Sequence, residues 1–290
     1  MTTLIEWTHF PDTIGETLNP IRAKYDGSPA EVYLLDQEVL ERPLHWRNPR
    51  TVFVCSMTDL FGPRVPGLWQ QAILDALAFS PEKHRVLFLT KRPERMAAVF
   101  EAWYRGRPGL SGLTRREMLG GVCPSFGLGV TAEDQQRATE RIPILLKIPA
   151  AMRFVSIEPM LGEVDLSAHG GIHCPEARGL LDWAIAGGET GPGARPMNPE
   201  WARSLRDQCQ AAGVPFFFKQ WGEWGESPVK SDTAAESWSV GLQPKRPRSE
   251  QAYHWPDGTV SYRVGKKQAG RLLDGREHSE FPQFGAGVTA

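Results

Sequence analysis

The sequence has 290 residues, of which 41% are hydrophobic, and its formal net charge at pH 7 is −1. A chain of this length buries about three quarters of its unfolded surface, enough for one large core. The near-neutral charge gives no overall attraction to nucleic acid or to anionic lipid. No stretch approaches the roughly 18 consecutive apolar residues of a membrane-spanning helix, and Met1 to Thr8 do not resemble a secretory signal.

The four cysteines are widely spaced and form no CxxC pair. They are Cys55, Cys123, Cys174 and Cys209. A disulfide framework is not expected for so few cysteines in a chain this long, so we expect reduced thiols and a cytoplasmic protein. Cys55 and Cys209 lie in apolar surroundings and fit the pattern of buried apolar cysteines.

Short apolar runs alternate with amphipathic segments through most of the chain. Continuous runs of apolar and β-branched residues are typical of parallel strands buried on both faces. The predicted strands are residues 51–55 (TVFVC), 85–89 (RVLFL), 127–130 (GLGV), 153–157 (RFVSI), 182–186 (DWAIA) and 215–219 (PFFFK). Residues 4–7 are a candidate for an additional first strand.

Four segments between these runs have helical periodicity: residues 66–79, 93–104, 132–148 and 198–212. The first opens with a proline and has one apolar stripe. Its members are Leu68, Trp69, Ala72, Ile73, Ala76 and Leu77.

The two later helices carry clearer signals at their ends. The third predicted helix has Glu133 and Asp134 in its first turn, and Pro143 is expected to bend or divide it. The fourth has Asn198 as N-cap with a proline behind it, and Gly213 closes it.

Strands separated by crossover helices imply right-handed βα units. They can close as an open doubly wound sheet or as a barrel. A doubly wound sheet would gather its polar residues at one switch point. Polar residues follow every predicted strand here, which favours the barrel. We therefore predict an α/β fold: a partial (β/α) barrel of about six parallel strands with outer helices, forming a single domain over residues 1–290.

Residues 225–253 are rich in Ser, Pro, Glu and Lys and predict a flexible surface loop. The basic run PKRPR at 244–248 fits a solvated loop, with a nucleic-acid contact as the alternative. Residues 254–282 form a C-terminal extension, in which the turn WPDG joins two short strands, 253–255 and 260–264. A short basic helix, 266–273, is expected to follow and to end at Asp274-Gly275.

In βα barrels the active site lies at the carboxyl ends of the strands. Charges of both signs around one mouth either pair with each other or bind a ligand. We predict ligand contacts there, with a structural ring of ion pairs as the alternative. The candidate residues are Ser56, Asp59, Lys91, Arg92, Thr131, Glu133, Glu158, Gly187, Gly188, Glu189, Arg195, Lys219, Gln220 and Trp221.

The segment GGETGPGARP, residues 187–196, is the most unusual of these loops. Its glycines allow close approach of the backbone to a ligand, and Arg195 offers a bidentate contact to a carboxylate or phosphate. It lacks the spacing of a Walker or dinucleotide motif. Trp221 and Trp224 are candidates for stacking on a base, with core packing as the alternative. No GxSxG nucleophile elbow occurs, and no metal site is predicted.

Several segments together are similar to one known family. They are IEWT at 5–8, PLHWRNPRTVFVCSMTDLFG at 43–62, LTKRPERM at 89–96, GVTAEDQ at 129–135, RFVSIEPMLG at 153–162, the segment 182–222, and VGKKQAGRLLDG at 264–275. They resemble a phage-type family of unknown function with a three-cysteine motif, regarded as similar to radical S-adenosylmethionine enzymes. The resemblance implies a partial βα barrel, with three cysteines holding an iron–sulfur cluster that S-adenosylmethionine completes.

The three cysteines of that family would lie between Asn19-Pro20 and residues 35–40, but residues 21–34 contain none. A cluster needs thiolate ligands, so we predict that this chain binds no cluster and runs no radical chemistry. We expect a scaffold that binds a small ligand, an adenosyl compound or a nucleotide, at the barrel mouth, and we assign no reaction. One alternative is a cluster-dependent enzyme acting on nucleic acid, with an altered N-terminal segment. The other is a nucleic-acid or protein interaction module that uses PKRPR, Lys266, Lys267 and Arg271. No membrane partner is expected.

Overall fold

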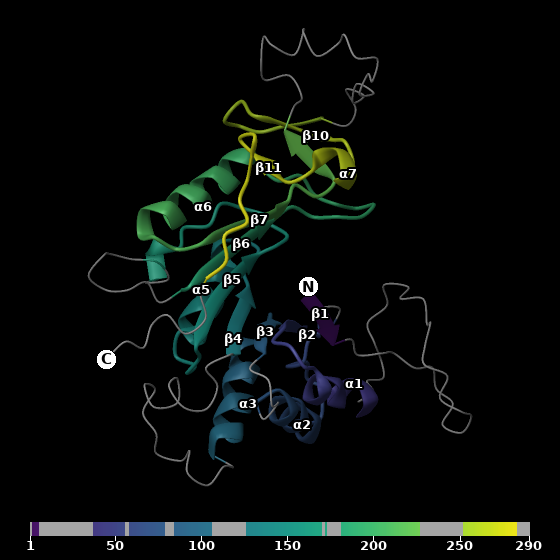
Figure 1. Ribbon diagram of the computed structural model, residues 1–290. Helices are drawn as coiled ribbons and strands as arrows, with labels where there is room; N and C mark the ends of the chain where they lie inside the picture. The colour runs from purple at the N-terminus through teal and green to yellow at the C-terminus, as the bar shows by residue number, and fades with distance from the viewer. Residues whose placement is uncertain are drawn as a thin grey trace. The chain divides into compact units, whose positions relative to one another are not determined.

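The computed structural model describes residues 2–5, 37–55, 58–78, 84–105, 126–169, 172, 181–226 and 252–282. Within each of its two compact units the parallel strands follow chain order, β1 to β4 in one and β5 to β7 in the other (Figure 1). A doubly wound sheet reverses its strand order at a switch point, and no reversal occurs here. The predicted α/β fold with the parallel strands of a partial barrel is therefore confirmed.

The chain divides into two compact units, which are described separately. The first unit comprises residues 1–130, 144–153 and 283–290. Its strands are β1 (Thr2–Ile5), β2 (Thr51–Val54), β3 (Arg85–Thr90) and β4 (Phe126–Thr131), each paired in parallel with the next. Its helices are α1 (Gln37–Glu41), the 3-10 helix η1 (Arg42–His45), α2 (Gly67–Ala78) and α3 (Pro93–Arg105).

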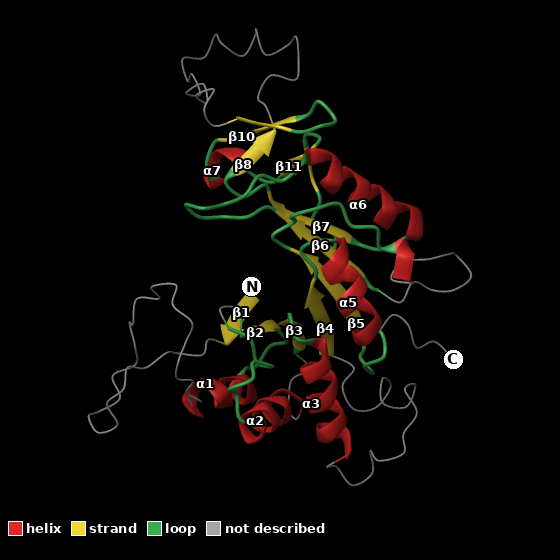
Figure 2. Cartoon of the chain, turned by 180° about the vertical axis from the view of Figure 1, so that it is seen from behind, coloured by secondary structure: helices red, strands yellow, loops and turns green. Residues whose placement is uncertain are grey.

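Helices α2 and α3 lie side by side along the strands of this unit (Figures 1 and 2). The helix predicted at residues 93–104 is confirmed as α3, and its Phe100 packs against Phe61, Phe88 and Phe126 in a buried aromatic cluster. Such contacts add to the free energy that burial of the rings provides.

The predicted stripe of α2 is wrong at Leu68, which is 78% exposed. The inward positions include Gln70 and Leu74 instead. Gln70 is buried because its Nε2 donates a hydrogen bond to the carbonyl of Leu60, 2.9 Å away. A buried amide with a hydrogen-bond partner avoids most of the free-energy cost of desolvation. The spacing of apolar residues alone does not predict such a buried polar side chain.

The second unit comprises residues 131–143 and 154–282. Strands β5 (Met152–Ile157), β6 (Trp183–Gly187) and β7 (Phe216–Gln220) pair in parallel. The helices are α5 (Gln135–Leu145), the 3-10 helix η2 (Ser167–His169) and α6 (Pro199–Ala212). The predicted caps of α6 are confirmed: Asn198 accepts a hydrogen bond from the Glu200 amide, and Gly213 is left-handed with φ 68°.

Helix α5 differs from its predicted range at both ends. It begins at Gln135, because Asp134 acts as a cap whose Oδ1 accepts from the Arg137 amide at 2.8 Å. Glu133 and Asp134 therefore precede the first turn. The helix also continues through Pro143 to Leu145, so the proline does not divide it.

The C-terminal part of this unit is antiparallel. Strands β8 (Trp224–Glu226), β10 (Val260–Arg263) and β9 (Ala252–His254) form a small sheet in that order, and the predicted hairpin is confirmed. Helix α7 (Lys266–Ala269) is shorter than predicted, because Gly270 adopts φ 68° and ends it. Strands β11 (Leu272–Leu273) and β12 (Arg276–Glu277) follow, and Asp274-Gly275 is the turn between them.

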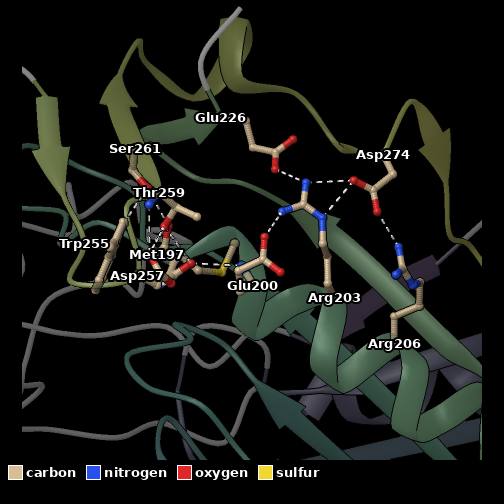
Figure 3. A network of polar contacts seen from close by, with 11 residues as sticks. Met197, Glu200, Arg203, Arg206, Glu226, Trp255, Asp257, Thr259, Ser261 and Asp274 are labelled. Carbon is tan, nitrogen blue, oxygen red and sulfur yellow. Dashed lines mark hydrogen bonds and ion pairs between the residues drawn. The ribbon is translucent and has the colours of Figure 1, made fainter. Parts of the chain in front are cut away.

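A network of ion pairs joins α6 to these C-terminal elements (Figure 3). Arg203 binds Glu200, Asp274 and Glu226, with 2.7 Å to each of the first two. Arg206 binds the second oxygen of Asp274 at 2.6 Å. Asp274 thus links the β11–β12 turn to two successive turns of α6.

The described residues include no helix that is long and apolar enough to cross a membrane. Residues 227–251, with the PKRPR run, and residues 6–36, where the family cysteines would fall, lie outside the described part of the chain. The single domain predicted from the sequence stays a prediction.

Candidate functional site

In the first unit, Asp59 organises the carboxyl end of β3. Its carboxylate accepts hydrogen bonds from the Thr90 hydroxyl at 2.9 Å and from the Phe61 amide at 2.9 Å. Arg92 Nη1 lies 2.6 Å from Asp59 Oδ2. The structure thus brings two predicted site residues together, and adds Thr90, which directly follows the strand predicted at 85–89 but is not among the predicted site residues. Ser56 lies outside the described residues.

This arrangement holds the loop after β2 against the end of β3. Asp59 binds the backbone at Phe61, and Arg95 Nε donates to the Phe61 carbonyl at 2.7 Å. Arg92 is exposed, so its ion pair contributes little in high dielectric. The predicted Lys91 lies beside it and is also exposed.

In the second unit, Glu158, Lys219 and Gln220 form what we call the Glu158 cluster. Glu158 follows β5, and the other two are the last residues of β7. Lys219 Nζ lies 3.0 Å from Glu158 Oε2, and Gln220 Nε2 donates to Oε1 at 3.1 Å. The Glu158 side chain is 19% exposed and that of Lys219 is 54% exposed. A mostly buried carboxylate therefore lies beside an ammonium group that faces solvent.

Gly187 ends β6 beside the Glu158 cluster. A Cβ atom at this residue would lie 3.1 Å from Glu158 Oε1, so the missing side chain leaves room for the carboxylate. The Gly187 carbonyl accepts a hydrogen bond from the Met160 amide at 2.9 Å, which anchors the segment that follows Glu158. A side chain at Gly187 would therefore require a small shift of the Glu158 carboxylate.

Gly188 brings the loop after β6 against the loop after β7. A Cβ atom here would lie 1.9 Å from the Trp221 carbonyl oxygen, and the Gly188 amide donates to the Gln220 carbonyl at 2.8 Å. The sequence predicted that this glycine loop approaches a ligand closely. In the structure Gly188 approaches the backbone of the loop after β7 instead. It fixes the end of β7, where Lys219 and Gln220 lie.

Three further predicted site residues, Glu133, Glu189 and Arg195, form ion pairs within the chain. Arg195 binds both carboxylate oxygens of Glu189, at 2.7 and 2.8 Å, and this bond raises the pKa of Arg195. Arg141 Nη1 binds Glu133 Oε2 at 2.8 Å and the Thr131 carbonyl at 2.7 Å. At these residues the charged side chains pair with each other, as in the structural ion-pair alternative to ligand binding.

Trp221 packs in the core, which was the alternative to stacking on a base. Its ring is buried and packs against Phe218 with 4.8 Å between centroids. Its indole Nε1 donates to the Leu272 carbonyl at 2.8 Å, so the polar edge of the ring is satisfied within the chain. Trp224 Nε1 donates to the Ala194 carbonyl at 2.7 Å.

Cys55 and Cys209 are both buried, as predicted. Burial, with a smaller contribution from the charge of Asp59, raises the pKa of the Cys55 thiol well above 9.0, although a hydrogen bond with Thr58 opposes the shift. Burial also raises the pKa of Cys209 to about 12. Both thiols are therefore protonated at neutral pH.

An iron–sulfur cluster is held by several cysteine thiolates, and among the described residues the cysteines are Cys55 and Cys209. They belong to different units. Within the described ranges no three His, Cys, Asp or Glu side chains gather as a metal site. Cys123 and Cys174 lie outside those ranges.

The fold and these clusters define an α/β protein with polar side chains gathered at the carboxyl ends of parallel strands. The chain belongs to the family described as "Protein of unknown function (DUF5131)", whose model matches residues 13–282. Searches of curated proteins and of solved structures found no match. The membership in a family of unknown function predicted from the sequence is thereby confirmed over most of the chain.

Proposed function

We propose that this protein binds a small polar ligand, an adenosyl compound or a nucleotide, at the Glu158 cluster. The observation that carries the proposal is the pairing of a solvent-facing ammonium group with a mostly buried carboxylate at the carboxyl ends of β5 and β7. Ligand sites of βα proteins lie at this end of the strands.

The donors and acceptors of the cluster suit such a ligand. The Lys219 ammonium has three donors, of which Glu158 takes one, so further donors can reach a carboxylate or phosphate group. The Glu158 carboxylate has lone pairs beyond those used by Lys219 and Gln220, and these can accept from ribose hydroxyls or from an ammonium group.

The support around the cluster favours binding over a merely structural ion pair. Both flanking loops are fixed by backbone hydrogen bonds, from Met160 to Gly187 and from Gly188 to Gln220. A site held on strands and fixed loops loses little entropy when a ligand binds.

The resemblance to radical S-adenosylmethionine enzymes supports the choice of adenosyl compounds. The proposed contacts are made by Glu158, Lys219 and Gln220, so the proposed binding requires no cluster. Stoichiometric iron and sulfide in the anaerobically purified protein would contradict this part of the proposal and favour a cluster-dependent enzyme.

Titration calorimetry tests the binding with S-adenosylhomocysteine, ADP and adenosine as probes. Lys219→Met and Glu158→Gln should each weaken binding of the preferred probe by at least about tenfold, which is about 1.4 kcal/mol. Lys266→Met, which removes an exposed lysine on α7, is the matched control and should bind as the unmodified protein does. No heat from any probe, or equal affinity in all variants, would contradict the proposal.

A further inference from the structure

The free edge of β7 is covered by residues 278–281, which we call the C-terminal strap. The Phe218 amide donates to the His278 carbonyl at 2.9 Å, and the Glu280 amide donates to the Phe216 carbonyl at 3.3 Å. Phe217 and Ser279 face each other as an antiparallel bridge. The strap is thus a very short edge strand, and few backbone bonds hold it.

Side chains add to the attachment, among them Arg271, which donates a hydrogen bond to the Ser279 hydroxyl. Trp183 Nε1 donates to the Glu280 carbonyl at 2.9 Å, and the ring of Trp183 lies 4.3 Å from that of Phe281. The Glu280 carboxylate accepts from the Phe216 amide at 3.0 Å. An element held by so few contacts opens at a low free energy compared with the core.

His278 is the buried member of the strap. It is 4% exposed, and its ring packs edge-on against Phe216 with 5.6 Å between centroids. Among the described residues, His278 Nδ1 has no hydrogen-bond partner, while the ring makes a hydrogen bond with the backbone of Leu273. A proton added at Nδ1 would be a buried donor without an acceptor, which destabilises the docked strap.

The charges around His278 also oppose its protonation. Burial contributes most, and Arg276 on β12 and Arg206 on α6 add to it, so the pKa of His278 lies below its ordinary value of 6.5. Glu280 on the strap acts in the opposite direction and does not overcome the others.

We propose that the C-terminal strap is an acid-released edge strand, which leaves β7 when His278 takes up a proton. A lowered pKa means that the released state binds the proton more readily than the docked state. The docking free energy is therefore fully present above pH 6.5 and falls as the pH drops from 6.5 through the lower pKa of the docked state. The inference is independent of the ligand proposed above.

Hydrogen exchange of the full chain at about pH 7.5 and about pH 5.5, corrected for intrinsic exchange, tests this inference. We expect the Phe218 and Glu280 amides to lose protection by at least about threefold at the lower pH. In His278→Gln, which is neutral at both values, this pH-dependent loss should disappear. His254→Gln, which removes an exposed histidine on β9, should behave as the unmodified protein.

Equal protection of the two amides at both pH values in the unmodified protein would overturn the inference. The same loss in His278→Gln would overturn it too, because the loss would then come from another group. His278→Phe is the second variant should the glutamine prevent folding, since it keeps the ring contact with Phe216.

Discussion

At the scale of single residues, the glycines that follow β6 have different roles. Gly188 lies against the backbone of the next loop, where a Cβ atom would be 1.9 Å from the Trp221 carbonyl oxygen. Gly193 has no atom within 4 Å of the corresponding point. The same chemical change at the two residues therefore has different consequences.

We expect Gly188→Ala to lower the free energy of unfolding by about 3 kcal/mol, because two backbone segments must separate. Gly193→Ala is the matched control and should change it by less than about 0.5 kcal/mol. Urea unfolding midpoints of the two variants measure the difference. Similar midpoints would mean that the two loops do not pack as closely as the structure has them.

The expectation that polar residues gather at the carboxyl ends of the strands located most of the polar clusters. It did not show which residues pair. Asp59 and Arg92, and Glu158 and Lys219, are separated by more than thirty residues in the sequence. Their pairing depends on strand register, which is a tertiary property. The burial of Trp221 likewise depends on Phe218 and Leu272 together, so its role did not follow from the local sequence.

At the scale of elements, α6 is the most completely specified helix. Asn198 Oδ1 accepts from the Glu200 amide at 2.9 Å, and Asn198 Nδ2 donates to Asp257 Oδ2 at 2.8 Å. One side chain therefore caps the helix and also binds the turn of the β9–β10 hairpin. Its two roles can be separated by mutation.

We expect Asn198→Ala to lower the free energy of unfolding by about 2 kcal/mol, because both the cap and the link to the hairpin are lost. Asn198→Asp keeps the cap acceptor but places a carboxylate against Asp257, so it should fall between Asn198→Ala and the unmodified protein. Thermal and urea unfolding measure both variants. If Asn198→Asp were as stable as the unmodified protein, the link to Asp257 would carry no free energy.

The difference between α6 and α7 shows why some elements follow from sequence. Asn198 and Gly213 are local signals at both ends of α6, and both predicted ends are confirmed. The helix predicted through residue 273 ends early because Gly270 adopts a positive φ of 68°. Asp274 also has a positive φ of 53°, which suits the turn between β11 and β12. Short polar segments with several such residues do not reveal which of them ends the helix.

At the scale of the whole molecule, the alternation of apolar runs and helical segments was sufficient for the α/β class. The sequence pattern did not indicate the division into two units. One unit boundary falls inside α5, after Pro143, and another falls inside β5, after Arg153. Unit boundaries within regular elements depend on long-range contacts and not on linker composition. The ion pairs of Arg203 and Arg206 with Asp274 have the same origin, since they join residues about seventy positions apart.

Asp274 connects this long-range network to the acid stability of the protein. Its hydrogen bond with Arg203, and then that with Arg206, hold the pKa of Asp274 below its ordinary value of 3.8. A carboxyl group with a lowered pKa stabilises the folded state above pH 3.8, and this contribution is lost as the pH falls through the folded-state pKa. The network should therefore be strongest at neutral pH.

We expect Asp274→Asn to lower the free energy of unfolding at neutral pH by about 1 kcal/mol, since solvent screens a side chain that is 41% exposed. Asparagine tolerates the left-handed backbone, so the change removes charge without straining the turn. Urea unfolding at neutral pH and at about pH 3 measures the difference, which should shrink in acid as Asp274 itself takes up a proton. Asp207→Asn, which removes an exposed partner of Arg206, is the control and should differ little from the unmodified protein at neutral pH. A difference for Asp274→Asn that stays constant down to the lower pH would mean that the charge of Asp274 contributes nothing to folding.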